Sequence, residues 1–397
     1  MKLVVFGLSV SSSWGNGHAV LWRALIRALA AQDHRTVFFE RDVPWYAEHR
    51  DLTEIDGGRL VLYADWHEAA PAARRELRDA EAAIVTSYCP DGVAATEFVL
   101  DAPGLHVFYD LDTPVTLARL AAGEQIEAIG PRGLAPFDLV LSYTGGGALT
   151  ALTERLGARR VAPLYGSVDP TRYRPAEPPS DPLAALSYLG TYAADRQDKL
   201  DALLLEPARR RPDWRFVIGG AQYPQDFAWS NNIFFRRHVA PADHPRFYAA
   251  ARATLNVTRR SMAESGWCPS GRLFEAAACA APILSDWWEG LDAFFTPDAE
   301  IIAVRASRDV LAALDRGDGE LRRIAGAARD RALSEHTADR RAAELVDLLA
   351  TANRHPVGRP PVDSIRREDR ERYSNRLSGC SGDPGSRRGD PGGVLED

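Results

Sequence analysis

Short apolar runs alternate with longer segments of helical spacing along most of the chain. In the first half, the apolar runs predict strands at 3–8, 36–39, 60–63, 82–86, 105–109, 139–142 and 160–163. Helical spacing predicts helices at 18–31 and 146–156. Buried parallel strands read as continuous apolar runs because helices cover both faces of their sheet. The pattern therefore predicts a doubly wound α/β domain with right-handed crossovers.

A second series of the same kind begins after residue 182. It predicts strands at 185–189, 214–218, 233–235, 253–257, 282–285 and 300–304. It predicts helices at 195–205, 245–251, 272–278, 307–314 and 318–335. We therefore expect two Rossmann-like domains, at 1–166 and 183–337, that face a cleft. Ligands of open α/β sheets bind there because strand ends, loops and helix N-termini converge.

Three segments lie outside the two series. The Pro-rich stretch 167–182 predicts an interdomain linker. Residues 338–354 carry apolar side chains on one side, which predicts a C-terminal helix that packs on a domain. From 355 to 397, Pro, Gly, Ser and charged residues dominate, so we expect a disordered tail.

Composition narrows the class of protein. Hydrophobic residues make up 45% and charged residues 26% of the 397 residues, which is typical of globular domains. A net charge of −7 argues against a protein that mainly coats nucleic acid. No apolar run approaches the roughly 20 residues of a membrane span, and no signal-peptide pattern is present. The four cysteines form no C-x-x-C pair and indicate reduced thiols, so we expect a cytoplasmic protein.

The segment 261–300 contains the most specific candidate site. Ser270 and Gly271 open a predicted helix, and Arg272 lies in its first turn. Backbone N–H groups, the positive end of a helix and a guanidinium together favour a pyrophosphate ligand. Glu275, one turn further, can accept hydrogen bonds from both hydroxyls of a ribose. A surface helix with an Arg272–Glu275 ion pair would explain the same spacing.

Residues 272–291, R-L-F-E-A-A-A-C-A-A-P-I-L-S-D-W-W-E-G-L, resemble the donor-site segment of GT-B glycosyltransferases, and particularly their CgeB-like (spore maturation) branch. Further motifs at 11–19, 109–114, 189–197 and 335–337 fit the same family. The resemblance implies a GT-B fold, with a nucleotide-diphosphate sugar held by the second domain and an acceptor held mainly by the first.

The same resemblance assigns roles to single residues. It implies that Glu275 binds the ribose and that Arg272 lies near the diphosphate. Trp267 stands where many related enzymes have a second glutamate that contacts the donor sugar. Donor identity and stereochemical outcome therefore stay open. Asp286, Glu289 and Gly290 lie in the matching segment and are weaker candidates for contacts with the donor sugar.

A second phosphate-binding candidate follows the strand predicted at 185–189. Gly190 lets a phosphate approach the backbone N–H groups of the turn, where Thr191 follows. Arg196 and Lys199 add positive charge on the next helix, which Asp195 is expected to cap. Similar enzymes carry an Arg/Lys pair on the diphosphate at this place. An ordinary turn with solvated cations is the alternative interpretation.

The acceptor-side candidates follow the first strand. Gly15, Asn16 and Gly17 form a Gly-rich turn, and His18 begins the next helix. An ordinary histidine pKa near 6.5 suits a general base that takes a proton from an acceptor hydroxyl. A helix-terminal histidine that satisfies backbone groups is the alternative. The turn is not a G-x-G-x-x-G fingerprint, which makes an NAD-linked oxidoreductase a distant hypothesis.

Asp110 and Asp112 form a D-x-D pair, a pattern that holds a divalent metal in single-domain GT-A glycosyltransferases. Asp112-Thr113-Pro114 also predicts a helix cap with Pro in the first turn. The two-domain layout resembles the metal-independent class. We therefore assign Asp112 to capping, keep Asp110 as an acceptor-side catalytic candidate, and expect no metal.

The main hypothesis is metal-independent transfer of a hexosyl group from a nucleotide-diphosphate sugar to an acceptor hydroxyl. The alternatives are a nucleotide-sugar epimerase on the same fold and a catalytically silent sugar-nucleotide-binding protein. The expected partners are the donor, which acts as co-substrate in place of any cofactor, and a small-molecule, glycan or protein acceptor. Nucleic acid and an integral membrane segment are not expected.

Overall fold

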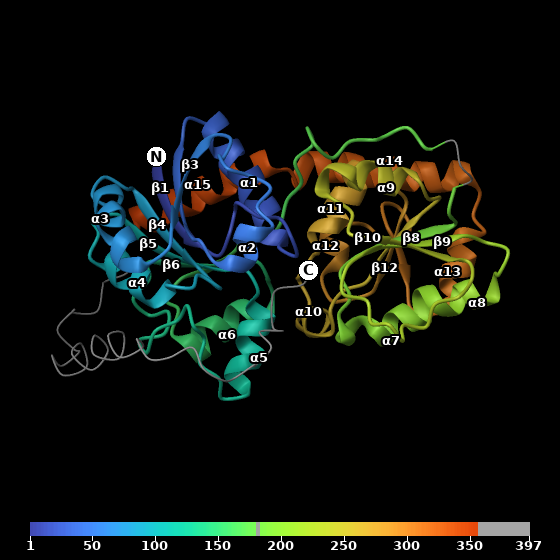
Figure 1. The fold of residues 1–397 in the computed structure, drawn as a ribbon, viewed down its shortest axis with the longest axis horizontal. Helices are drawn as coiled ribbons and strands as arrows, with labels where there is room; N and C mark the ends of the chain where they lie inside the picture. Colours follow the sequence, from blue (N-terminus) through green and yellow to red (C-terminus); the bar gives the residue numbers. More distant parts are fainter. Residues whose placement is uncertain (180–182, 356–397) are drawn as a thin grey trace.

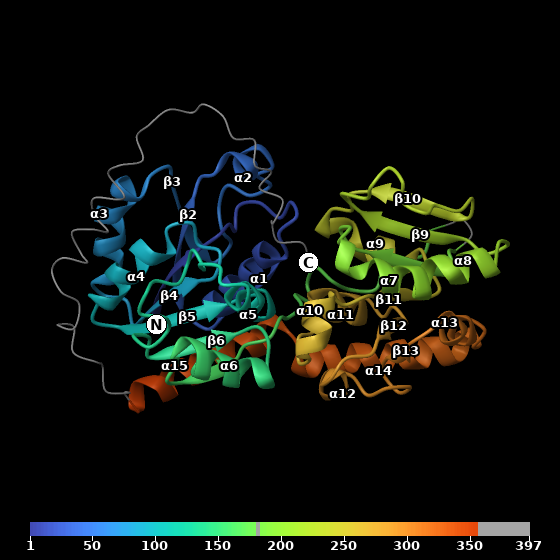
Figure 2. The same ribbon diagram turned by 90° about the horizontal axis from the view of Figure 1, so that it is seen from below.

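The computed structural model describes residues 1–179 and 183–355 and contains two parallel sheets covered by helices (Figures 1 and 2). The first sheet has seven strands in the order β3-β2-β1-β4-β5-β6-β7, and the second has six in the order β10-β9-β8-β11-β12-β13. Neighbouring strands run parallel in both sheets. The prediction of an α/β fold with two Rossmann-like, doubly wound domains is confirmed.

The first domain is a regular succession of strands and helices. Its elements are β1 Lys2–Gly7, α1 Gly17–Ala31, β2 Arg35–Arg41, α2 Pro44–Glu48, β3 Gly58–Tyr63, α3 Trp66–Leu77, β4 Ala82–Thr86, α4 Gly92–Leu100, β5 Leu105–Asp110, α5 Thr113–Ala121, β6 Leu139–Ser142, α6 Gly147–Leu156 and β7 Val161–Pro163.

The second domain repeats this plan with shorter elements. They are β8 Leu186–Leu189, the 3-10 turn η1 Ala194–Arg196, α7 Gln197–Leu200, the π-helical turn η2 Asp201–Leu205, α8 Glu206–Arg210, β9 Phe216–Gly220, β10 Ile233–Arg237, the 3-10 turn η3 Pro241–Asp243, α9 His244–Ala249, β11 Thr254–Asn256, α10 Arg260–Ser265, α11 Gly271–Ala278, β12 Ile283–Asp286, α12 Leu291–Phe294, β13 Ile302–Val304, α13 Ser307–Leu314 and α14 Asp318–Glu335. A final helix, α15 Ala338–Arg354, follows.

Every strand predicted from an apolar run is present. The central strands β4, β6, β8 and β12 are buried along their whole length, which explains their continuous apolar runs. In β1, Val5 contributes to the core on the α1 side of the sheet, while Val4 and Phe6 contribute to the core on the other side. Helices with weaker patterns were missed. In α3, for example, only Ala69, Ala73 and Leu77 are buried. The helix predicted at 195–205 is a chain of short 3-10, α and π turns.

The C-terminal helix α15 packs on the first domain, although it directly follows α14 of the second (Figures 1 and 2). Its residues Ala342, Leu345 and Leu349 share a core cluster with Trp22 and Leu25 of α1. The sequence predicted that this helix packs on a domain, but its amphipathic pattern did not say which one. The chain therefore passes twice between the two domains.

The two passages run side by side. The Val168 N–H donates to the His336 carbonyl (2.9 Å), and the Val168 carbonyl accepts from the Ala338 N–H (2.9 Å). The buried Arg341 of α15 also donates from Nε to the Gly166 carbonyl (3.2 Å). The predicted linker at 167–182 therefore begins as an ordered segment. Its last residues, 180–182, the predicted tail beyond residue 355, and Cys380 lie outside the described residues.

His336 lies at the centre of this crossing. Arg341 Nη2 donates to His336 Nδ1 (3.1 Å), so the ring proton lies on Nε2, which faces the Phe294 carbonyl (3.3 Å). Burial, reinforced by the charge of Arg341, lowers the pKa of His336 to about 4. Within residues 1–179 and 183–355, no helix combines the length and the apolarity that crossing a bilayer requires.

Acidification should therefore loosen the crossing. The unfolded His336 binds a proton below its ordinary pKa of 6.5, whereas the folded ring does so only near pH 4. The contribution of His336 to the free energy of unfolding is thus fully present above about pH 6.5. It is lost as the pH drops toward 4, by about 3 kcal/mol in total. We expect the free energy of unfolding of His336→Gln, measured by chemical denaturation, to change less between pH 6.5 and pH 4 than that of the wild type. The matched variant of the exposed His67, His67→Gln, should leave this pH dependence unchanged.

Candidate functional site

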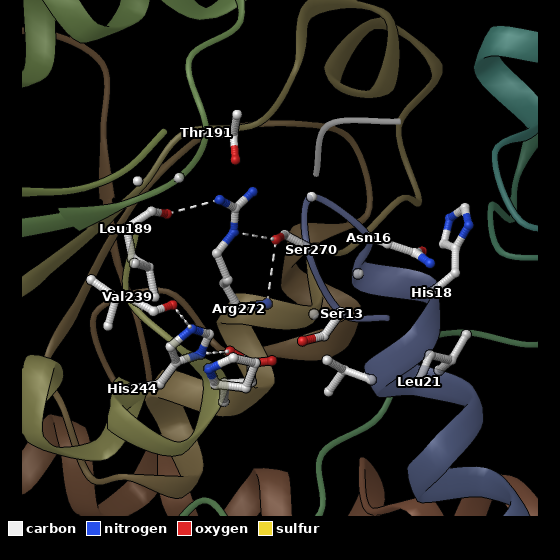
Figure 3. Close-up of a pocket in the computed structure, with 18 of the residues that line it drawn as sticks. Ser13, Asn16, His18, Leu21, Leu189, Thr191, Val239, His244, Ser270 and Arg272 are labelled. Atoms are coloured by element: carbon white, nitrogen blue, oxygen red, sulfur yellow. Dashed lines mark hydrogen bonds and ion pairs between the residues drawn. The ribbon is translucent and has the colours of Figure 1, made fainter. Parts of the chain in front are cut away.

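A pocket lies between the two domains, where the carboxyl ends of their strands face each other (Figure 3). From the first domain and the first crossing it is lined by Ser13, Trp14, Gly15, Asn16, Gly17, His18, Val20, Leu21, Tyr143, Gly166 and Ser167. From the second domain it is lined by Leu189, Gly190, Thr191, Gly220, Ala221, Gln222, His238, Val239, Pro241, His244, Ser270, Gly271, Arg272 and Glu275. This is the place where ligands bind in open α/β sheets.

Arg272 is fixed in position before any ligand arrives. Its Nη1 donates to the Leu189 carbonyl at the end of β8 (2.8 Å), and its Nε lies 3.4 Å from Ser270 Oγ. Ser270 is the N-cap of α11, and its hydroxyl also accepts from the Arg272 backbone N–H (3.3 Å). The guanidinium therefore stands at the positive end of α11, facing the pocket (Figure 3).

Two glycines allow the strand ends beside Arg272 to approach closely. A Cβ on Gly190 would lie 2.7 Å from Arg272 Nη1, and a Cβ on Gly220 would lie 1.9 Å from the Gly190 carbonyl oxygen. The Gly190 N–H donates to Gly219 (2.9 Å), and its carbonyl accepts from the Tyr223 hydroxyl (3.0 Å). Gly190 therefore adds no side chain to the pocket wall, although its own N–H and carbonyl groups already have partners.

Glu275 lines the pocket one turn beyond Arg272 and is 9% exposed. It forms no ion pair with Arg272. Instead, its Oε2 lies 3.0 Å from Nδ1 of His244, at the start of α9. The i,i+3 ion pair considered from the sequence is thus replaced by a contact between two elements.

Arg196, Lys199 and Asp286 lie behind the pocket and do not line it. Arg196 is 2% exposed and donates from Nη1 to the Thr191 carbonyl (3.3 Å), so it supports the loop after β8. Lys199 forms an ion pair with Asp286. Burial raises the pKa of Asp286, while Lys199 and the Thr258 donors act in the opposite direction.

The capping role predicted for Asp195 is wrong. Ala193 occupies the N-cap of the 3-10 turn, and Asp195 lies within that turn. Its Oδ2 accepts from the Arg260 N–H (3.2 Å) and pairs with the Arg259 side chain (3.4 Å). Asp195 therefore joins the loop after β8 to the start of α10.

Trp267 fills a contact between the domains and does not line the pocket. Its carbonyl accepts from Gly145 of the first domain (3.0 Å), and its N–H donates to the Glu289 carbonyl (2.7 Å). The indole lies so close to Gly146 and Gly290 that a Cβ on either would come within 2.5 Å of it. The exposed Glu289 and the left-handed Gly290 (φ +90°) therefore support Trp267 in this structure.

The loop at residues 9–17 is organised by a buried carboxylate that sequence analysis missed. Glu40, at the end of β2 and 0% exposed, accepts hydrogen bonds from the Val10 N–H (2.7 Å), the Ser11 N–H (2.9 Å) and two serine hydroxyls. Charge-assisted bonds of this kind are stronger than neutral ones. Glu40 thereby determines how this loop enters the pocket. Asn16 adds a bond from Nδ2 to the Ser9 carbonyl (3.2 Å).

His18 lies in the first turn of α1, on the side of the pocket opposite Arg272 (Figure 3). It is 8% exposed, and its ring lies 6.0 Å from that of Tyr88. The Tyr88 hydroxyl donates to Asp112 Oδ2 (3.1 Å), and burial raises the pKa of Tyr88. Gly15, Asn16, Gly17 and His18 thus share one wall, as the sequence placed them.

Asp110 ends β5 and is fully buried outside the pocket lining. Its Oδ1 accepts from the Asp112 N–H (3.1 Å) and the Thr116 hydroxyl (3.1 Å), and burial raises its pKa. Asp112 occupies the N-cap position of α5, but its side chain makes no capping bond, contrary to the prediction. Within the described residues, no group of three or more His, Cys, Asp and Glu side chains is arranged to hold a metal.

An aromatic stack across the pocket mouth was also not predicted. The Trp14 ring lies 4.7 Å from that of His49 in its own domain and 4.2 Å from that of His238 in the other. His238 directly follows β10, and its place at a strand end could have identified it from the sequence as a candidate pocket residue. No local pattern marks a partner for Trp14, because the stack joins residues far apart in the chain.

The comparisons with known proteins agree with this architecture. Residues 196–347 match a family described as glycosyl transferase-like. The chain is similar to sucrose-phosphate synthase from Thermosynechococcus elongatus, with a TM-score of 0.67 and 13% identity over 89% of this chain and 99% of that one. HepE from Anabaena, solved with UDP and glucose, gives a TM-score of 0.63 and 14% identity over 88% and 100%.

The β-glucosyltransferase of phage T4 gives a TM-score of 0.59 and 12% identity over 89% of this chain and 99% of that one. No curated protein sequence matches the chain. At such low identities, the likeness to solved structures shows the fold, which is GT-B as predicted.

The contact between Gly146 and Trp267 can be tested by adding one methyl group. Gly146 has φ +56° and ψ −136°, a conformation almost restricted to glycine, and its Cβ would lie 2.4 Å from the indole. We expect Gly146→Ala to lower stability by about 1–3 kcal/mol, measured as a lower Tm. Gly147→Ala is the matched control because a Cβ there meets no atom within 4 Å. Equal Tm values for the two variants would contradict the assigned contact.

Proposed function

We propose that the protein transfers a hexosyl group from a nucleoside-diphosphate sugar to an acceptor hydroxyl, without a metal. The observation that carries this proposal is the wall formed by Arg272, the start of α11 and the backbone at Gly190 and Thr191. Residues 13–18, which include His18, form the facing wall. The family match at residues 196–347 includes Arg272 and the start of α11, and the similar HepE was solved with UDP and with UDP-glucose.

In this proposal, the acceptor oxygen attacks the anomeric carbon while the bond from that carbon to the diphosphate oxygen breaks. The diphosphate leaves with the electron pair, and Arg272 and the adjacent backbone N–H groups stabilise its charge. Because Leu189 and Ser270 already hold the guanidinium, little reorganisation is needed during the reaction. His18 takes the proton of the acceptor hydroxyl.

The residues behind the pocket act through their neighbours. We assign Arg196 to fixing Thr191, and Lys199 to neutralising Asp286 behind the diphosphate site. Asp110 positions the segment after β5 on the acceptor side. Glu289 and Gly290 stay predictions for the donor sugar side.

Two further assignments belong to the proposal. We propose that the protein belongs to the CgeB-like (spore maturation) branch, which the motifs around residues 272–291 support. A cytoplasmic location agrees with Cys89, Cys268 and Cys279, which are buried and form no disulfide.

A thermal-shift screen with UDP, GDP, dTDP and their sugars identifies the donor. A ligand at a hundred times its dissociation constant stabilises the fold by about 2.7 kcal/mol. With that donor, we expect Arg272→Ala to lower kcat/KM on the order of 10²-fold or more, because one stabilising donor to the leaving group is lost. Arg322→Ala, at an exposed position of α14, is the control.

The outcomes separate the candidate functions. Unchanged turnover in Arg272→Ala would overturn the assignment of the leaving-group site. Conversion of the donor without any acceptor would indicate an epimerase. Nucleotide binding without transfer or hydrolysis across acceptors would indicate a sugar-nucleotide-binding protein without catalysis.

A further inference from the structure

His244 contacts Glu275, the carboxylate that the resemblance to GT-B glycosyltransferases assigns to the ribose. Its Nδ1 lies 3.0 Å from Glu275 Oε2, and its Nε2 lies 3.3 Å from the Val239 carbonyl oxygen (Figure 3). Both side chains are mostly buried, with 14% and 11% of their surface exposed. His244 and Val239 also line the pocket. The imidazole is therefore held between a backbone carbonyl and the carboxylate, in the wall of the proposed nucleotide site.

Both partners of the His244 ring offer acceptor atoms. A backbone carbonyl oxygen accepts hydrogen bonds, and so does a carboxylate oxygen. The two ring nitrogens therefore face one acceptor each, on two different parts of the second domain.

The contact also restricts how the carboxylate can turn. The Glu275 side chain has free rotation at its terminal bond unless a partner holds one oxygen. His244 holds Oε2 and is itself anchored through Val239, on a different element from Glu275. The Tyr173 side chain also interacts with Glu275, so His244 and Tyr173 together restrict the carboxylate relative to the pocket.

We infer that His244 is a positioning residue that sets the preference of this site for ribonucleotide over 2′-deoxyribonucleotide donors. This inference rests on the proposed function. A fixed, buried acceptor pairs with a ribose hydroxyl and is left unpaired when the hydroxyl is missing, which penalises the deoxy ligand. A carboxylate that can turn finds another partner or water, so it discriminates less.

The experiment compares two substitutions of His244 by amide residues, each of which keeps a hydrogen-bond donor near one of the two ring nitrogens. His244→Asn keeps a donor near the position of Nδ1, toward Glu275, and His244→Gln keeps one near the position of Nε2, toward Val239. The probes are the nucleoside diphosphate found in the thermal-shift screen and its 2′-deoxy analogue. Isothermal titration calorimetry gives the ratio of their two Kd values for each protein.

For the wild type, we expect the deoxy analogue to bind about 10-fold more weakly or worse, as for a lost hydrogen bond to a charged group. His244→Asn should keep most of this ratio, whereas His244→Gln should bring it close to that of Glu275→Gln. A merely structural role of the histidine predicts no such difference between Asn and Gln. His67→Phe, at an exposed position, is the control and should keep the wild-type ratio.

The readouts distinguish the two possible failures. If the wild type binds no nucleoside diphosphate, both the proposed function and this inference fall. If the wild type discriminates and Glu275→Gln does not, but His244→Gln keeps the full ratio, only the role of His244 is overturned. Each variant is compared separately with the wild type. A retained ratio in His244→Gln overturns the role of His244 even if His244→Asn does not fold, and a lost ratio in His244→Asn overturns it even if His244→Gln does not fold.

Discussion

The pocket depends on the double passage of the chain between its two domains. Val168 of the first passage pairs with His336 and Ala338 of the second, and α15 then returns to pack on α1. Each domain is thus tied to the other by two covalent connections that also bond to each other. This crossing holds the two domains in a fixed relative orientation, so the strand ends of both sheets face the same pocket.

Two further contacts between the domains add to this arrangement. Trp267 of the second domain lies against Gly145 and Gly146 of the first, and Trp14 of the first lies against His238 of the second. Both tryptophans make contacts that need a flat, rigid side chain with large area. At Trp267, a position expected to contact the donor sugar contributes to the domain contact instead.

Charged side chains in and behind the pocket are each held by a neighbouring polar or charged group. In the pocket, Arg272 is fixed by a carbonyl and a hydroxyl and Glu275 by His244, and behind it Lys199 pairs with Asp286. On the facing wall, Glu40 is fixed by serine hydroxyls and backbone N–H groups. Sites arranged in this way work by electrostatic preorganisation, because the polar groups need not reorient when a charged ligand arrives. The α/β scaffold supplies the rigid strand ends that make this possible.

The sequence by itself determined what depends on neighbours along the chain. The apolar runs specified the strands, and the glycines and Arg272 at strand and helix ends indicated residues that line the pocket, since buried strands and helix N-termini leave local signatures. The tertiary structure alone decided what depends on distant residues. The packing of α15 on the first domain, the pairing of His244 with Glu275 and the place of Trp267 between Gly146 and Gly290 arise from chain segments that meet only after folding. An amphipathic helix or a single histidine carries no information about its partner, because its partner is selected by the shape and charge of a surface that the local sequence does not encode.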